Sequence, residues 1–252
     1  MILRRVIKHF RKQEWTAIFF DFLIVVVGVF VGLQVANWSA ARANRADDLL
    51  YMQRLHEEIE RSDTKMAVIS DELHTTVSLL KEVLDIIYGD EPVKSLTRDQ
   101  CDAVFASHIY RPGRVSIPTL EELISSGRAS IISDLPLRRA ILHLSQLRKA
   151  TDDFIERTGS DVVVLSRKYP QMILLNKELT YDRYGTSPYG GHQCFPERIR
   201  DSAGFRNDLA DNLYRMDSFI RLSYSPELAM LDHTHTILDE ILDIEHKAEP
   251  TL

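Results

Sequence analysis

The sequence lacks the short motifs that mark common enzyme classes, since its 252 residues contain no HExxH, GxSxG, P-loop or GxGxxG pattern. It also lacks an excess of positive charge, because its formal net charge is -6 at pH 7, and this argues against a nucleic-acid partner. Only 10 residues are glycine, and no stretch alternates apolar and polar residues as a strand does. These absences favour a helical, non-enzymatic protein that needs no cofactor.

An apolar run over residues 16–36 is the most informative feature that the sequence does contain. A helix of about 20 such residues, at 1.5 Å each, spans the hydrocarbon core of a bilayer, which is about 30 Å thick. Basic residues are more numerous before the run than after it: Arg4, Arg5, Lys8, Arg11 and Lys12, against Arg42 and Arg45. Because positive residues gather on the cytoplasmic side, we expect a cytoplasmic N-terminus and a chain body outside the bacterial inner membrane, in the periplasm.

This pattern predicts three parts: a basic amphipathic cytoplasmic segment over residues 1–15, a transmembrane helix over 16–38 and an extracytoplasmic domain over 39–252. The main alternative is a cleaved signal peptide, for which residues 41–43 (ARA) provide a small-x-small site. The apolar run is longer than the roughly 7 to 15 residues of a signal sequence, so the anchored form is the preferred interpretation.

Asp21, Gly28 and Gly32 fall on one stripe of the expected membrane helix. A GxxxG pair lets two helices approach closely, and an acidic side chain in hydrocarbon costs roughly 3 kcal/mol unless it faces protein or water. One interpretation is an association face, used for a homodimer or for contact with another membrane protein. The other is that Asp21 reaches the nearby headgroups and that the glycines have no special role.

Beyond the membrane run, apolar residues keep a 3-4 spacing over about five heptads, with Ser62 and Thr76 at the two missing positions: Leu55, Ile59, Met66, Ile69, Leu73, Leu80, Val83 and Ile87. This spacing predicts a long helix that continues out of the membrane and ends at the turn residues 89–92 (GDEP). The apolar stripe needs a partner, which is either another chain or, preferably, later helices of the same chain.

Start and stop signals predict the remaining helices: 97–108, 119–127, 134–167, 205–222 and a last one from 225. The first two begin with capping boxes, Thr97 with Gln100 and Thr119 with Glu122, and the last begins with Ser225 as its cap. The predicted fold class is therefore all-α, with a single N-terminal transmembrane helix followed by a long helix and an antiparallel helical bundle.

Two segments resemble an uncharacterised bacterial family, a domain of unknown function with one N-terminal transmembrane helix. Residues 25–39 (VVVGVFVGLQVANWS) are similar to its apolar, glycine-containing helix that ends in Gln, Asn-Trp and a small residue. Residues 118–127 (PTLEELISSG) are similar to its Thr-x-x-x-Leu-x-x-x-Gly core. The segments cover about a tenth of the chain, and Val35-Ala36-Asn37 departs from the more usual Ile-Asn-Asn. The resemblance implies this topology and a helical extracytoplasmic domain, and it carries over no catalytic residue.

The two cysteines, Cys101 and Cys194, allow one disulfide in an oxidising compartment, or two separate thiols. With His108 and His192 they also have the residue types of a zinc site, although neither pair has the short spacing of a structural zinc motif.

A histidine cluster near the C-terminus is the second candidate for chemistry. His233 and His235 follow Asp232, and Asp239 lies on the same helix face as His235. His235 and Asp239 are able to bind a metal or to act as a base pair, but such pairs are more often solvated surface contacts. A third candidate is a recognition loop, in which Tyr181, Tyr184 and Tyr189 either contact a ligand or hold the loop on the bundle.

Three functional hypotheses follow. The preferred one is a non-enzymatic protein in the inner membrane, whose periplasmic helical domain binds a partner or ligand as a scaffold or accessory protein. The second is a membrane-tethered hydrolase with a metal near His233, His235 or His192. The third is a small subunit of a membrane complex that is contacted through Asp21.

Overall fold

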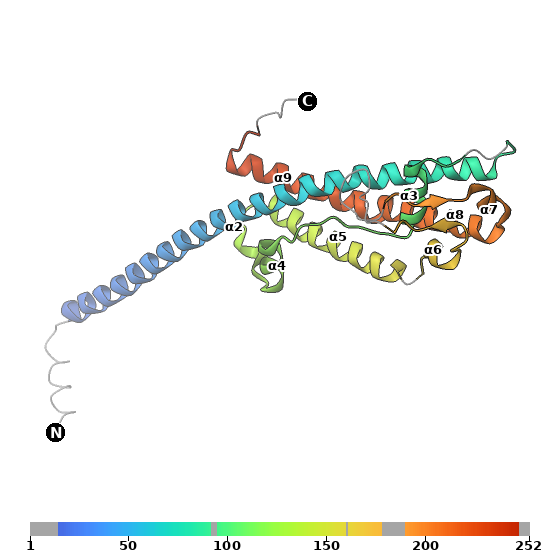
Figure 1. The fold of residues 1–252 in the computed structure, drawn as a ribbon. Helices are drawn as coiled ribbons and strands as arrows, with labels where there is room; N and C mark the ends of the chain where they lie inside the picture. Colours follow the sequence, from blue (N-terminus) through green and yellow to red (C-terminus); the bar gives the residue numbers. More distant parts are fainter. Residues whose placement is uncertain (1–14, 92–94, 160, 178–189, 247–252) are drawn as a thin grey trace, which may run out of the picture. The chain divides into compact units, whose positions relative to one another are not determined.

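A computed structural model describes residues 15–91, 95–159, 161–177 and 190–246 of the chain. Most of these residues are helical, which confirms the all-α class (Figure 1). The one pair of strands in the described part is short and antiparallel, with β1 at Ile173–Leu174 and β2 at Gln193–Cys194. The chain divides into two compact units, residues 1–50 and residues 51–252.

Helix α2 runs without a break from Trp15–Tyr88, and it ends where the predicted turn begins. In the first unit its apolar side chains are exposed, and the most apolar stretch has no buried residue. By length and composition, α2 is the one described helix that is able to cross a membrane. A Cβ added at Gly28 or Gly32 would meet nothing within 4 Å, while the side chain of Asp21 lies outside the described part.

In the second unit, the predicted stripe of α2 forms one side of the hydrophobic core. Ser62 at one of the missing heptad positions is fully buried, whereas Val77 is buried in place of the half-exposed Thr76. Later helices of the same chain complete this core, and the hydroxyl of Tyr224 donates to the carbonyl of Met66 at 2.7 Å. Within the second unit, residues of the same chain therefore cover the stripe.

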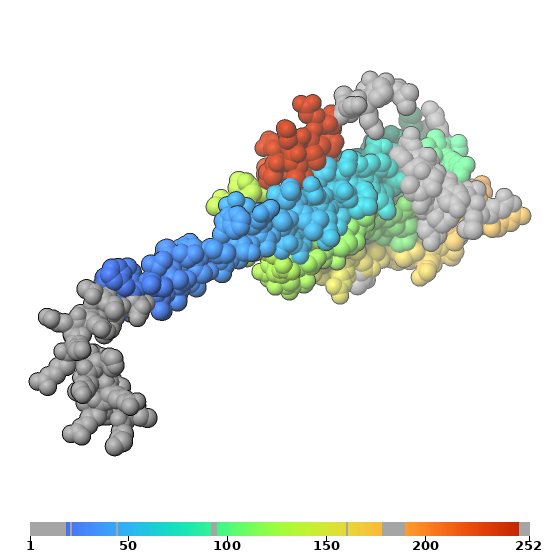
Figure 2. Space-filling model, turned by 90° about the vertical axis from the view of Figure 1, so that its left-hand side faces the viewer, coloured from blue at the N-terminus to red at the C-terminus, as the bar shows by residue number. Residues whose placement is uncertain are grey.

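The other helical elements are α3 Arg98–Ala106, α4 Pro118–Ser125, η1 Arg128–Ile131, α5 Leu135–Gly159, α6 Leu165–Lys168, α7 Pro196–Asp201, α8 Ala203–Phe219, η2 Ile220–Tyr224 and α9 Ser225–Leu242. Helices α5 and α9 pack along each other. The end of α9 lies against the part of α2 that follows residue 50 (Figure 2). The capping box of Thr97 and Gln100 is present as predicted. Gly127 ends the α4 segment with φ 69°.

Three predicted helix caps or boundaries are wrong. Helix α4 begins at Pro118 without a side-chain cap, because the backbone and hydroxyl of Thr119 donate to Glu58 instead of forming a capping box. The helix from 134 ends at Gly159 rather than near 167, before three β-branched valines at 162–164. Ser225 is not a cap, since the π-helical turn η2 joins α8 to α9 and the Ser225 N–H donates to Ile220.

One ionic cluster lies inside the bundle. Glu227 on α9 is fully buried, with one carboxylate oxygen 3.3 Å from Arg114 Nε and 3.8 Å from a terminal nitrogen of Arg148. Arg114 also donates to Asp152 at 2.5 Å. Burial raises the pKa of Glu227, and the two arginines oppose this shift. Because a buried charge without its partner is costly, these groups hold the positions of α5 and α9 around residue 114.

Candidate metal centre

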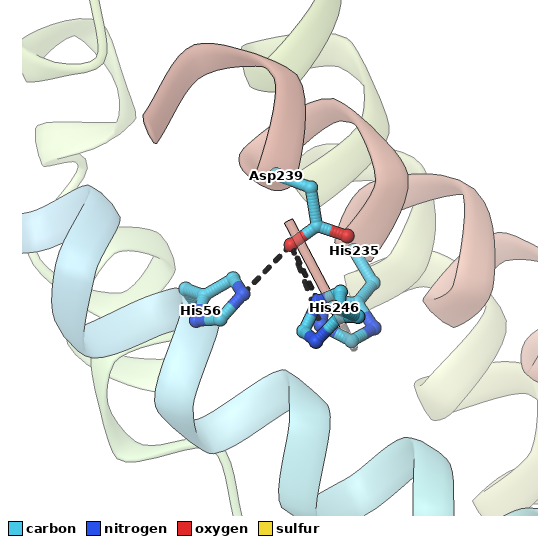
Figure 3. Close-up of side chains that lie close together, drawn as sticks. All are labelled: His56, His235, Asp239 and His246. Carbon is cyan, nitrogen blue, oxygen red and sulfur yellow. Dashed lines mark hydrogen bonds and ion pairs between the residues drawn. The ribbon is translucent and has the colours of Figure 1, made fainter. Parts of the chain in front are cut away.

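Four side chains from three segments of the chain meet at the end of α9 (Figure 3). His56 comes from α2, His235 and Asp239 come from α9, and His246 comes from the segment that follows α9. Each of them offers one ligand atom, and these four atoms all lie within 4.8 Å of one another. We call this group the His–Asp cluster.

The course of the backbone explains how the C-terminal part contributes two separate segments. His235 and Asp239 are four residues apart and therefore share one face of α9. The helix ends at Asp243, which adopts the left-handed conformation with φ 55°, and the N–H of Ile244 donates to the carbonyl of Asp239 at 3.0 Å. This turn redirects the chain, so that His246 returns to the carboxylate of Asp239.

The three imidazole rings converge on a single oxygen. His56 Nε2 lies 2.8 Å and His246 Nε2 lies 2.9 Å from Asp239 Oδ1, within hydrogen-bond distance. His235 Nε2 lies 3.7 Å from the same oxygen. The rings of His56 and His246 are stacked, with an interplanar angle of 14° and centroids 5.7 Å apart.

Burial is graded across the cluster. His56 is buried, His235 and Asp239 are mostly covered, and the side chain of His246 is 44% exposed. His235 Nε2 is buried and has no hydrogen-bond partner. A buried polar atom without a partner is uncommon and destabilising, and here it faces the oxygen on which the other two rings converge.

Two further carboxylates flank the outer edges of the rings. Asp63 Oδ2 lies 3.8 Å from His235 Nδ1, and Glu60 Oε1 lies 4.0 Å from His246 Nδ1. Burial, and secondly the charge of Asp232, raise the pKa of Asp63. Metal-binding histidines usually direct their second ring nitrogen to a carboxylate or carbonyl, which orients the ring and increases its basicity.

The carboxyl of Asp239 is stabilised in its charged form by these neighbours. Burial alone would raise its pKa, but hydrogen bonds from His246 and His56 and the proximity of His235 hold the pKa below its usual value. A carboxylate that is ionised over the neutral pH range is the form in which Asp binds a cation.

The donor set of three imidazole nitrogens and one carboxylate oxygen fits a divalent transition-metal ion. Bonds of about 2.0 to 2.2 Å in a tetrahedral site place ligand atoms about 3.3 to 3.6 Å apart. The observed separations from Asp239 Oδ1, 2.8, 2.9 and 3.7 Å, bracket that value. Imidazole nitrogen binds zinc, copper, nickel and cobalt well, whereas calcium and magnesium prefer oxygen ligands. Four protein ligands also fill a tetrahedral site, whereas a catalytic zinc keeps one position open.

The sequence predicted only half of this cluster. It singled out His235 and Asp239, whereas the adjacent His233 and Asp232 are exposed and lie outside the cluster. His56 and His246 were missed. The signal for His56 was an imidazole directly after the buried Leu55 of the heptad stripe, and His246 gave none because it follows the last helix.

The two cysteines, which the sequence offered as a disulfide or as ligands of a zinc site, form a disulfide. Cys101 on α3 and Cys194 on β2 are joined by a disulfide, with their Cα atoms 5.6 Å apart. Their sulfurs are therefore not available as thiolate ligands, and a zinc site that includes them is wrong. His108 and His192 instead lie near the ring of Phe105, and burial lowers the pKa of both histidines.

The predicted recognition loop lies outside the described residues, including Tyr181, Tyr184 and Tyr189. At its described end, the backbone N–H groups of Gly191 and His192 donate to Asp102 at 2.9 and 3.0 Å. Among the described residues, the His–Asp cluster is therefore the candidate site from which a function is argued.

Comparisons with protein-family models, with curated proteins and with solved structures find no match to this chain.

Proposed function

We propose that this protein is a membrane-anchored metal-binding protein, in which His56, His235, Asp239 and His246 hold one divalent transition-metal ion. The observation that carries the proposal is the convergence of three Nε2 atoms, from three separate segments, on one carboxylate oxygen. The unpartnered, buried Nε2 of His235 supports it further, because a metal ion would give this atom a partner.

The proposed role is to hold the ion rather than to catalyse hydrolysis. Four protein ligands from the cluster would complete a tetrahedral shell, and hydrolysis needs a position for water. This keeps the non-enzymatic scaffold or accessory role that the sequence favours, with the metal ion as the ligand. A metal-dependent hydrolase would instead show turnover of a simple ester or phosphoester only when metal is bound.

The anchor is the second part of the proposal. An apolar, wholly exposed stretch of α2 and the basic residues before it support a single transmembrane helix over residues 16–38, with the helical domain in the periplasm. Unfilled space beside Gly28 and Gly32 leaves room for a second helix, in a homodimer or a larger membrane complex.

Metal binding is tested on the full chain in detergent, by titration of the metal-free protein with Zn²⁺ in a calorimeter. We expect one Zn²⁺ per chain. In His235→Ala and Asp239→Ala we expect the dissociation constant for Zn²⁺ to rise by about 10-fold to 100-fold or more. His233→Ala is the matched control, since it removes an exposed histidine from the same helix outside the cluster.

Two results would contradict the proposal. One is the absence of Zn²⁺ binding to a folded wild-type chain, together with no binding of Co²⁺, Ni²⁺ or Cu²⁺. The other is an equal loss of affinity in His233→Ala, which would place the ion elsewhere. Metal analysis of protein extracted gently from its native membrane would identify the resident ion, and mass spectrometry of the same sample would identify any partner.

A further inference from the structure

We infer that the metal ion also fastens the C-terminal segment, residues 243–246, onto α2, so that occupancy of the site controls whether this segment is docked. The inference rests on the proposed metal binding. It adds a regulatory consequence, because the ion would join the first and last described segments of the helical unit.

The segment has little hold of its own. It leaves α9 through the left-handed Asp243, and all four of its residues are exposed. Its backbone is tied to the helix by the Ile244 N–H, which donates to the Asp239 carbonyl at 3.0 Å. Beyond this turn, the side chain of His246 makes a hydrogen bond to Asp239 and an ion pair with Glu60.

His246 contacts both walls of the cluster. Its Nε2 lies 2.9 Å from Asp239 on α9, its Nδ1 lies 4.0 Å from Glu60 on α2, and its ring stacks on His56 of α2. A partly exposed hydrogen bond of this kind holds a chain weakly, because water competes for both groups. A metal ion at this place would bind both His246 and His56. Opening the segment would then require breaking the bond between the ion and His246.

Thermodynamic linkage makes the inference quantitative. If docking of the segment strengthens Zn²⁺ binding by some factor, Zn²⁺ must stabilise the docked segment by the same factor. His246→Ala removes the docked imidazole, so its loss of Zn²⁺ affinity measures that factor. The other three ligands remain, and we expect this variant still to bind Zn²⁺, at least about 10-fold more weakly.

The test is cleavage of the full chain, in detergent, by a protease specific for glutamate. Glu245 is exposed and lies inside the segment, and local opening exposes the bond that follows it. Mass spectrometry measures the rate of release of residues 246–252, with and without saturating Zn²⁺. A synthetic peptide of residues 240–252 is cleaved in parallel, to correct for any effect of Zn²⁺ on the protease.

We expect Zn²⁺ to slow cleavage at Glu245 in the wild type and in His233→Ala, by a factor that agrees within about threefold with the affinity lost in His246→Ala. In His246→Ala, Zn²⁺ should leave the rate unchanged. If Zn²⁺ binds to the wild type but does not slow cleavage, or slows it equally in His246→Ala, the inference is wrong and the proposed function stands. If Zn²⁺ does not bind at all, both are wrong.

Discussion

Removal of the Cys101–Cys194 disulfide should cost the helical unit a large part of its stability. The bond joins positions 93 residues apart, and it connects α3 to the short strand β2. In the chain-entropy description, closing a loop of this size in the unfolded chain is worth about 4.6 kcal/mol at 25 °C. Most domains have only about 5 to 15 kcal/mol in total, so the double variant Cys101→Ser/Cys194→Ser should be marginally stable.

Urea unfolding of the full chain in detergent, followed by circular dichroism, measures this loss. We expect a reduction in the free energy of unfolding of about 3 to 5 kcal/mol, and a fall in Tm of about 2 to 4 °C for each kcal/mol. Reducing agent should destabilise the wild type to a similar extent and leave the double variant unchanged. If mass spectrometry shows the bond to be formed and the loss is below about 1 kcal/mol, the chain-entropy reasoning fails for this protein.

Three other predictions concern the site and the core. Zn²⁺ at about 100 times the wild-type dissociation constant should raise the free energy of unfolding by about 2.7 kcal/mol, and in Asp239→Ala the same Zn²⁺ concentration should raise it by about 1.4 kcal/mol or less, with a correspondingly smaller rise in Tm. Gly113→Ala should lower the free energy of unfolding by about 2 to 4 kcal/mol in urea, because φ is 61° and the new Cβ would lie 2.5 Å from Ile69. Gly127→Ala, also at positive φ but in open space, should cost only about 1 to 2 kcal/mol, and an equal cost at the two sites would refute the steric explanation. The raised pKa of Glu227 means that its folded form favours the proton, so its contribution to stability is greatest below the usual pKa of 4.5 and falls as pH rises through the folded value. The stability of the wild type minus that of Glu227→Gln, measured by urea unfolding at several pH values, should therefore decrease with rising pH, and an increase would contradict the assignment.

The fold was predictable where the sequence pattern that specifies a helix lies within that helix. The heptad stripe of α2 and the end of that helix at Tyr88 follow local patterns, and the structure confirms both. One error arose because a distant residue takes the hydrogen bonds that a local residue was expected to make. Thr119 has the sequence of a capping box, but Glu58, 61 residues earlier, takes its hydroxyl and its N–H. No local pattern contains that information.

The site was predictable only within a helix. The spacing of His235 and Asp239 placed them on one face, which the structure bears out. His56 lies 183 residues from Asp239, and only the packing of α2 against α9 brings the two together. His246 depends on the positive φ of Asp243, a conformation that glycine or asparagine would have signalled more clearly than aspartate.

The pairing of α2 with α9 also has a consequence for biosynthesis. The buried stripe of α2 is synthesised first, but residues that cover it, such as Tyr224 in the turn η2 just before α9, are synthesised more than 150 positions later, as the hydrogen bond from Tyr224 to Met66 shows. At a synthesis rate of about 5 to 20 residues per second, roughly 8 to 30 s pass between the synthesis of the stripe and that of Tyr224. During that interval a row of leucines, isoleucines and valines is open to other nascent chains. The nascent chain should therefore depend on a chaperone that binds exposed apolar segments, until its last helix has left the ribosome.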